Sequence, residues 1–168
     1  QPIGELVDRT IPGPGGSRPI RISRPQGAAQ SRRGILVYYH GGGFVVGNLD
    51  SHDSVCAELA DGSGQMVVAV DYRLAPEHSF PAGIEDCYAG LAWTFANADA
   101  LGIDRARIGV MGESAGGGLA AALALLARDR GAYKIAFQHL IYPMLDDRTC
   151  VTQSPNPVAG EFIWTRHN

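Results

Sequence analysis

The sequence predicts an α/β fold with a largely parallel sheet flanked by helices, and two patterns lead to this prediction. Four short apolar runs, rich in β-branched and aromatic residues, recur without regular polar positions, which is typical of parallel strands buried on both faces. Segments with helical spacing of apolar residues lie between these runs, so strands and helices alternate. With 168 residues, the chain can form one domain with a sizeable core.

The expected elements follow one another along the chain. Turn residues separate two short segments that we expect to form an opening hairpin, Leu6–Ile11 and Pro19–Ser23. The four buried strands are expected at Ile35–Tyr39, Met66–Tyr72, Arg107–Met111 and Ala136–Tyr142. The helices are expected at Ser54–Asp61, Ala82–Ala96 and Ala115–Asp129. Right-handed crossovers would join these elements into a parallel sheet.

Composition and charge argue against several classes of protein. The net charge is −3, and no stripe of Lys and Arg suggests a nucleic-acid partner. The longest apolar run, Leu119–Ala127, is far shorter than the roughly 20 residues of a membrane span, so no membrane insertion is expected. Cys56, Cys87 and Cys150 lack metal-binding spacing, so no metal site is predicted. Free thiols and the absence of a signal-peptide pattern favour a cytoplasmic location.

A candidate nucleophile lies between an expected strand and an expected helix. Residues 112–116 read Gly-Glu-Ser-Ala-Gly, the G-x-S-x-G pattern of a sharp strand-to-helix turn that exposes a serine hydroxyl. Small neighbours leave room for a strained backbone, and the helix N-terminus directs partial positive charge at a developing oxyanion. The pattern predicts Ser114 as the nucleophile, with φ above zero. The alternative interpretation is a glycine-rich turn with a helix-capping serine.

Three consecutive glycines, Gly41–Gly43, follow the strand expected at Ile35–Tyr39. Such a run is costly in backbone entropy, and it suits a loop whose N–H groups must approach a ligand closely. In acyl transfer, such groups and the N–H after the nucleophile, here Ala115, bind the oxyanion. His40 is expected to anchor the loop by hydrogen bonds. A flexible loop or a phosphate-binding turn is the alternative, although the Lys-Ser/Thr or helix of a phosphate loop is absent.

Three motifs occur in a characteristic order: His-Gly-Gly-Gly-Phe at 40–44, Asp-Tyr-Arg-Leu-Ala-Pro-Glu at 71–77 and Gly-Glu-Ser-Ala-Gly-Gly at 112–117. Their order and separation resemble the hormone-sensitive-lipase-like family of α/β-hydrolases, which includes many bacterial carboxylesterases. The resemblance covers nearly the whole chain. It implies an α/β-hydrolase fold and a serine carboxylesterase that hydrolyses short- to medium-chain acyl esters through an acyl-enzyme, without a cofactor. It also implies an oxyanion hole formed by Gly42, Gly43 and Ala115, with Gly41 and His40 supporting the loop.

The chain also departs from this family. Members are roughly twice as long, with the acid of the triad after the seventh strand and the histidine after the eighth. We therefore expect residues 1–168 to form a partial catalytic domain of about six strands, without the last two strands, the cap, the triad acid and the triad histidine. Such a portion is expected to be inactive by itself. Asp71, Arg73 and Glu77 are expected to form a structural cluster of charges beyond their strand.

Alternatives remain open at this stage. Asp146 or Asp147 with His167 would form a triad in the right chain order. The alternative function is a non-catalytic protein that binds a small ligand on a hydrolase fold. The expected partner is a small-molecule ester substrate, and a homo-oligomer is also possible. His52 and His78 are expected at the surface or at helix caps. His139 is expected in the core.

Overall fold

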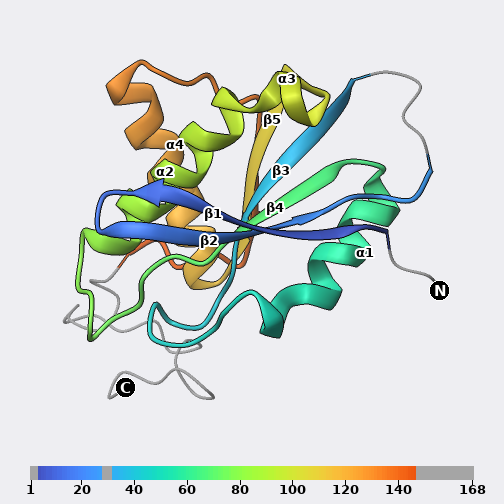
Figure 1. Ribbon diagram of the computed structural model, residues 1–168. Coiled ribbons are helices and arrows are strands. Elements are labelled where there is room, and N and C mark those ends of the chain that lie inside the picture. The colour runs from blue at the N-terminus through green and yellow to red at the C-terminus, as the bar shows by residue number, and fades with distance from the viewer. Residues whose placement is uncertain (1–3, 28–31, 147–168) are drawn as a thin grey trace.

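The computed structural model describes residues 4–27 and 32–146 of the chain. Within them, one sheet has the strand order β1-β2-β4-β3-β5-β6 (Figure 1). The strands are β1 (Leu6–Gly13), β2 (Gly16–Ser23), β3 (Arg33–Tyr39), β4 (Met66–Val70), β5 (Ile103–Glu113) and β6 (Gln138–Ile141). The helices are α1 (Asp53–Ser63), α2 (Ala82–Ala96), α3 (Ala98–Leu101) and α4 (Ala115–Arg130), with a 3-10 turn η1 (Asp50–His52) before α1.

The sheet is largely parallel, as the sequence predicted. β1 and β2 form the expected antiparallel hairpin, and β2 runs antiparallel to β4. β4, β3, β5 and β6 are parallel neighbours in that order. Val37 of β3 lies opposite Val68 on one side and Val110 on the other. The carboxyl ends of these four strands therefore meet at one edge of the sheet, and the loops that follow them gather there.

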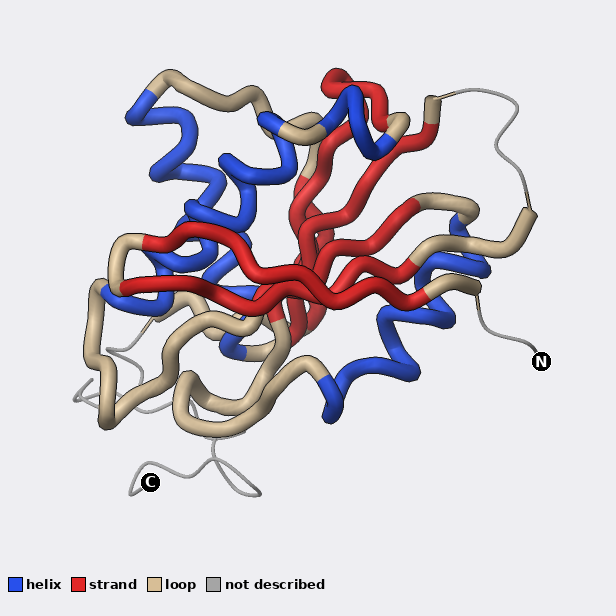
Figure 2. The backbone as a smooth tube through the Cα atoms, in the orientation of Figure 1, coloured by secondary structure: helices blue, strands red, loops and turns tan. Residues whose placement is uncertain are grey.

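Helices cover both faces of the sheet. Figure 2 shows α2 and α4 on one side and α1 on the other. Residues of β3 alternate between the two sides: Ile35, Val37 and Tyr39 pack with α2 and α4, whereas Leu36 and Tyr38 pack with α1. Both sets are buried, which explains why the strand reads as a continuous apolar run. None of the described helices has the length and hydropathy that a membrane span needs.

The predicted elements agree closely with the observed ones, with instructive differences. The helix predicted at Ala82–Ala96 is observed with the same bounds, and α4 extends one residue beyond its prediction. β5 begins at Ile103, before the predicted start, because its first residues pair with β3 across an irregularity in the register. The four-residue helix α3 was not predicted, since it is too short to show a helical period.

The last predicted strand and its histidine require a correction. Ala136–Tyr142 was expected to be a strand buried on both faces, but β6 spans only Gln138–Ile141 and is partly exposed. His139 was expected in the core and is exposed instead. The physical reason is the position of β6: it pairs with β5 on one side, and no strand of the described residues pairs with its other side.

The predicted cluster of charges has a different membership from the one expected. Arg73 does bind a carboxylate, but its partner is the fully buried Asp86 on α2, and not Asp71 or Glu77. The guanidinium donates from Nε at 2.7 Å and from Nη2 at 2.9 Å, and the Arg73 backbone N–H donates at 3.0 Å. This set of three hydrogen bonds ties the loop after β4 to α2.

Loss of this buried carboxylate should destabilise the protein that carries the chain. In the Asp86→Ala variant the Arg73 guanidinium loses its partner, so we expect the free energy of unfolding to fall by about 3–5 kcal/mol. Urea unfolding monitored by circular dichroism measures this. Asp129→Ala is the matched control, because Asp129 is exposed and its ion pair among the described residues is with its neighbour Arg128, so its effect should stay within about 0.5 kcal/mol. Equal effects of the two variants would contradict the role of Asp86.

Candidate active site

Ser114 occupies the turn between β5 and α4. Its backbone has φ 53° and ψ −119°, a positive φ that non-glycine residues rarely adopt. The predictions of a sharp turn and of a positive φ at Ser114 are confirmed. Strained backbone of this kind persists only where the surrounding structure holds it in place, and it concentrates at functional sites.

The glycines on either side of Ser114 allow the turn to pack against β3. A Cβ atom on Gly112 would lie 2.3 Å from the carbonyl carbon of Gly116. A Cβ atom on Gly116 would lie 2.0 Å from the Tyr39 carbonyl oxygen and 2.5 Å from that of His40. No larger side chain fits at either position, because the turn meets the end of β3 backbone to backbone.

Backbone hydrogen bonds with β6, with the loop after it and with α4 also hold the turn. The Ser114 N–H donates to the Ile141 carbonyl at 2.9 Å. The Ser114 carbonyl accepts from the N–H groups of Gly118 at 3.1 Å and Met144 at 3.0 Å. The backbone of Ser114 is thus fully used, while its hydroxyl has no hydrogen-bond partner within residues 4–27 and 32–146.

The loop after β3 needs its glycines. Gly42 has φ 121° and Gly43 has φ 61°, both in the region that favours glycine. A Cβ atom on Gly42 would lie 2.0 Å from the Val46 carbonyl oxygen, and the Gly42 carbonyl itself accepts from the N–H groups of Val45 and Val46 at 3.0 Å. The loop is therefore a tight, hydrogen-bonded turn and not a flexible segment.

This loop and Ser114 lie at the same edge of the sheet. β3 and β5 are adjacent and parallel, and Tyr39 at the end of β3 lies opposite Gly112. The Gly41 N–H donates to Oε1 of Glu113, the residue before Ser114, at 2.9 Å. The glycine loop therefore lies at the end of the sheet where Ser114 lies, which the predicted oxyanion hole requires.

Several backbone N–H groups at this edge have no acceptor among the described residues. Within the described part of the chain, nothing accepts a hydrogen bond from the N–H of Gly42, Gly43 or Ala115. The Gly41 N–H differs from them because Glu113 takes it. Ala115 opens α4, so the partial positive charge of the helix N-terminus adds to this donor. Unpartnered backbone N–H groups are the kind of donor that an oxyanion hole needs.

His40 is buried and anchors the start of the glycine loop. It is only 3% exposed, its Nδ1–H donates to the Gly41 carbonyl at 2.7 Å, and its ring stacks on Tyr72 with centroids 4.3 Å apart. The Tyr72 hydroxyl donates to the His40 carbonyl at 2.6 Å. Burial lowers the pKa of His40, which keeps the imidazole neutral. These contacts are those of an anchor, as predicted from the sequence.

The other predicted histidines have different surroundings. His78 is exposed, as expected. His52 was expected at the surface or at a helix cap; it stands before α1 but makes no side-chain cap, and its Nε2 lies 3.1 Å from Oε1 of Glu113. Of the alternative triad, Asp147 and His167 lie outside the described residues. The described histidines make no hydrogen bond with the Ser114 hydroxyl.

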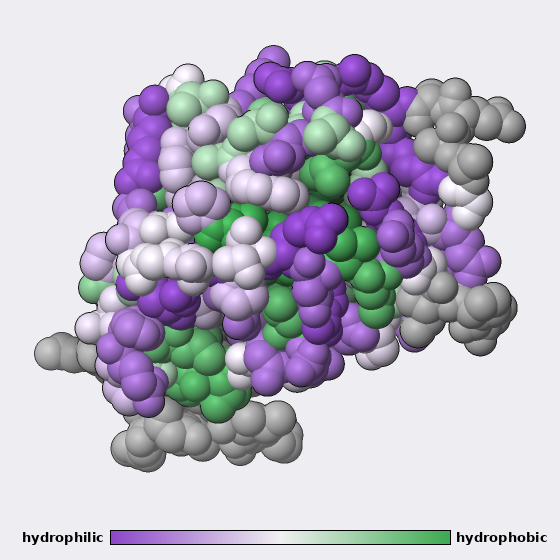
Figure 3. Space-filling model, in the orientation of Figure 1, coloured by the Kyte–Doolittle hydropathy of each residue, from purple (hydrophilic) through white to green (hydrophobic). Residues whose placement is uncertain are grey.

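An apolar cavity of about 550 Å³ opens beside the turn. Phe44, which follows the glycine loop, lines it together with Leu119 of α4 and Met144, whose N–H binds the Ser114 carbonyl. Its remaining walls are mostly apolar side chains of α2, α4 and the loops after β4 and β6. Figure 3 shows apolar surface low on the molecule, at the end where the loops after β3 and β4 lie in Figure 1.

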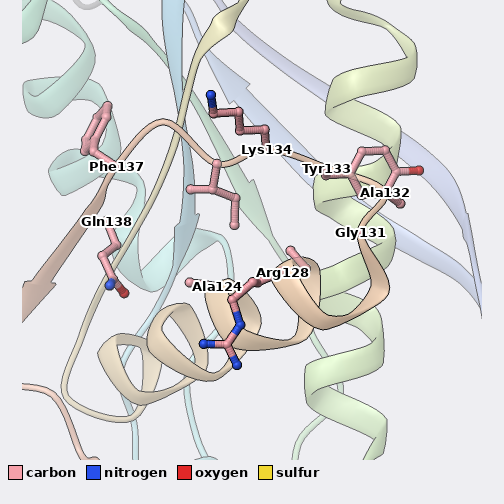
Figure 4. A pocket seen from close by; sticks show the side chains of 10 residues that line it. Ala124, Arg128, Gly131, Ala132, Tyr133, Lys134, Phe137 and Gln138 are labelled. Carbon is pink, nitrogen blue, oxygen red and sulfur yellow. The ribbon is translucent and has the colours of Figure 1, made fainter.

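A second hollow, of about 530 Å³, does not belong to this site. Figure 4 shows it between the C-terminal end of α4 and the segment that leads to β6, with Arg128, Tyr133 and Phe137 in its walls. α4 has 16 residues and is about 24 Å long, and Ser114 stands at its other end. In the described chain no group of three or more His, Cys, Asp or Glu side chains is placed to hold a metal ion.

Sequence reasoning overlooked two polar side chains next to the site, Glu113 and Tyr38. The Tyr38 hydroxyl donates to Oε2 of Glu113, whose Oε1 accepts from Gly41. Glu113 stands inside the G-x-S-x-G motif at a position that the motif leaves open. An ionisable residue directly before a nucleophile on a buried strand is the signal that could have pointed to it.

Comparisons with known proteins agree with this geometry. A family model described as alpha/beta hydrolase fold matches residues 36–168. Esterase LipI of Mycobacterium tuberculosis is 48% identical over 139 residues, which cover 82% of this chain and 43% of LipI. Ethyl acetate hydrolase of Pseudomonas putida is 45% identical over 134 residues, which cover 79% of this chain and 42% of that enzyme. The chain thus spans less than half the length of these two relatives.

Solved structures give the same result. A hyperthermophilic esterase from Pyrobaculum calidifontis aligns with a TM-score of 0.83 and 50% identity, over 93% of this chain and 48% of that protein. EstE1, a thermostable carboxylesterase from a metagenomic library, aligns with a TM-score of 0.84 and 44% identity, over 94% of this chain and 51% of EstE1. The motifs, the strained serine turn and these matches lead to one conclusion: the chain belongs to the hormone-sensitive-lipase-like family of alpha/beta hydrolases.

Proposed function

We propose that the protein is a serine carboxylesterase that hydrolyses short- to medium-chain acyl esters through an acyl-enzyme. The observation that carries the proposal is the juxtaposition of the unpartnered Ser114 hydroxyl with the glycine loop, whose Gly42 and Gly43 N–H groups have no acceptor in the described chain. The names of the relatives, esterase and ethyl acetate hydrolase, support the same reaction class.

In the proposed reaction, Ser114 Oγ attacks the ester carbonyl carbon and its proton passes to a general base. The tetrahedral intermediate places its negative oxygen among the N–H groups of Gly42, Gly43 and Ala115. Collapse of the intermediate breaks the bond to the alcohol, which leaves with a proton, and water then hydrolyses the acyl-enzyme and restores the hydroxyl. We assign the general base to a histidine outside the described residues, because no described histidine makes a hydrogen bond with the Ser114 hydroxyl.

The neighbouring cavity is our candidate for the acyl site. Its mostly apolar lining, which includes Phe44, Leu119 and Met144, suits an alkyl chain. The free thiols of Cys56 and Cys87 suit a reducing compartment, so we also propose a cytoplasmic location.

The role of Ser114 can be tested directly with p-nitrophenyl acetate and a fluorophosphonate probe. We expect Ser114→Ala to lower kcat by roughly 10⁴-fold or more and to abolish the covalent adduct seen by intact-protein mass spectrometry. Ser54→Ala, which changes an exposed serine of α1, is the control and should behave as wild type. If the wild type neither hydrolyses the ester nor takes up the probe, a non-catalytic ligand-binding role replaces the proposal.

Substitution of Gly42 tests the oxyanion hole. In Gly42→Ala the new methyl group collides with the Val46 carbonyl and moves the loop, so we expect kcat to fall by about 10²–10³-fold with little change in KM. Gly62→Ala is a matched control, because a Cβ atom at this exposed position of α1 meets nothing within 4 Å. A Gly42→Ala enzyme with wild-type kcat would show that the loop does not bind the oxyanion.

A series of p-nitrophenyl esters tests the acyl site. Each added methylene that enters the cavity should raise kcat/KM by about fourfold, since burial of a CH₂ group contributes about 0.8 kcal/mol. In Ala122→Phe the larger ring fills part of the cavity, so the gain with chain length should disappear while hydrolysis of the acetate is retained. An unchanged dependence on chain length in this variant would place the acyl chain elsewhere.

A further inference from the structure

Glu113 has no role in the reaction as described, yet its surroundings are unusual for a carboxylate. It ends β5 and precedes Ser114, and its side chain is only 16% exposed. Oε1 accepts a hydrogen bond from the Gly41 N–H at 2.9 Å and lies 3.1 Å from Nε2 of His52. Oε2 accepts a hydrogen bond from the Tyr38 hydroxyl. A single side chain therefore contacts β3, the glycine loop and the 3-10 turn η1.

These contacts replace the water that a carboxylate would otherwise hold. A largely buried carboxylate is costly unless several donors satisfy it, and here the donors come from segments distant in sequence. Gly41 is 72 residues and Tyr38 is 75 residues away along the chain. Hydrogen bonds to an ionised acceptor are about twice as strong as neutral ones. Burial and the adjacent carboxylate raise the pKa of Tyr38, so its hydroxyl stays a donor.

The hydrogen bond from Gly41 also determines which loop amides remain available. Because Glu113 takes the Gly41 N–H, that group cannot face a substrate, whereas the next two amides, of Gly42 and Gly43, have no acceptor in the described chain. Glu113 and Ser114 are consecutive residues, so the same short stretch of backbone carries the nucleophile and the carboxylate that holds the loop. A shift of either one moves both.

We propose that Glu113 is a positioning residue of the oxyanion hole, whose carboxylate holds the Gly41 N–H and thereby sets the Gly42 and Gly43 amides relative to Ser114. The proposal rests on the proposed esterase function. Glu113 itself does not touch the substrate; it acts through Gly41, and the contacts with Tyr38 and His52 hold the carboxylate in place.

The kinetic test compares Glu113→Ala and Glu113→Gln with the wild type in p-nitrophenyl acetate hydrolysis. Oxyanion contacts strengthen in the transition state, so we expect Glu113→Ala to lower kcat by about 10–100-fold with KM within about threefold. Glu113→Gln keeps the size and one acceptor oxygen, and it should recover part of the lost kcat. Glu58→Gln, which neutralises an exposed acid of α1, should leave kcat and KM unchanged.

A second measurement does not depend on catalysis. In protein labelled with ¹⁵N-glycine, amide hydrogen exchange reports directly on the Gly41 N–H. We expect exchange at Gly41 to accelerate at least about tenfold in Glu113→Ala, because the N–H loses the charged acceptor that protects it from exchange. The glycines at the exposed ends of helices, Gly64 and Gly131, should exchange as in the wild type.

The outcomes separate the two proposals. Unchanged Gly41 exchange in Glu113→Ala, or kcat equal to wild type in an active enzyme, would overturn the positioning role. The positioning role also fails if Glu113→Gln, although folded by circular dichroism, loses activity only through a raised KM. If the wild type is inactive and Ser114 takes up no probe, the esterase function fails, and the exchange measurement still decides whether Glu113 holds the loop.

Discussion

The carboxyl ends of β3 and β5 lie side by side because the two strands are parallel neighbours, with Tyr39 opposite Gly112. Everything at the candidate site depends on this adjacency. It brings the glycine loop, which follows β3, next to the serine turn, which follows β5. The approach is close enough that neither Gly112 nor Gly116 can carry a Cβ atom, since that atom would overlap backbone of the turn or of β3. The small residues around Ser114 therefore allow the turn to pack closely against the end of β3.

Two carboxylates, the fully buried Asp86 and the largely buried Glu113, organise the loops at this edge of the sheet. Asp86 takes three hydrogen bonds from Arg73 and ties the loop after β4 to α2. Glu113 takes donors from β3 and from the glycine loop. A buried charge is a net cost unless it is fully satisfied, so each carboxylate favours the one loop arrangement that supplies its donors. The loops thereby acquire defined positions that apolar packing alone would specify less sharply.

The strain at the site has identifiable supports. A non-glycine residue with positive φ costs of order 1–3 kcal/mol, and Ser114 keeps this conformation because its N–H and carbonyl are held by Ile141, Gly118 and Met144. The described part of the loop after β6 thus helps to hold the nucleophile through Met144. It also places Met144 in the wall of the apolar cavity, so the element that holds the nucleophile helps to shape the space next to it.

Local pattern alone predicted the features that depend on neighbours in sequence. The buried apolar runs of β3 and β4, the helix Ala82–Ala96 and the turn at Ser114 follow from burial on both faces, helical periodicity and the room that glycines leave, and all three are found where they were predicted. The last apolar run, Ala136–Tyr142, is not buried as predicted. Which distant groups meet was decided only by the tertiary structure. Arg73 could have met Asp71 or Glu77 nearby in sequence, but the face of α2 presents Asp86 to it. His139 lies in an apolar run, yet its exposure is set by the partly exposed strand β6 in which it stands. The hydrogen bonds of Glu113 with Tyr38 and Gly41 arise from strand order and register, which bring together residues more than 70 positions apart. Local residue spacing contains no information about such pairs, so the sequence did not predict them.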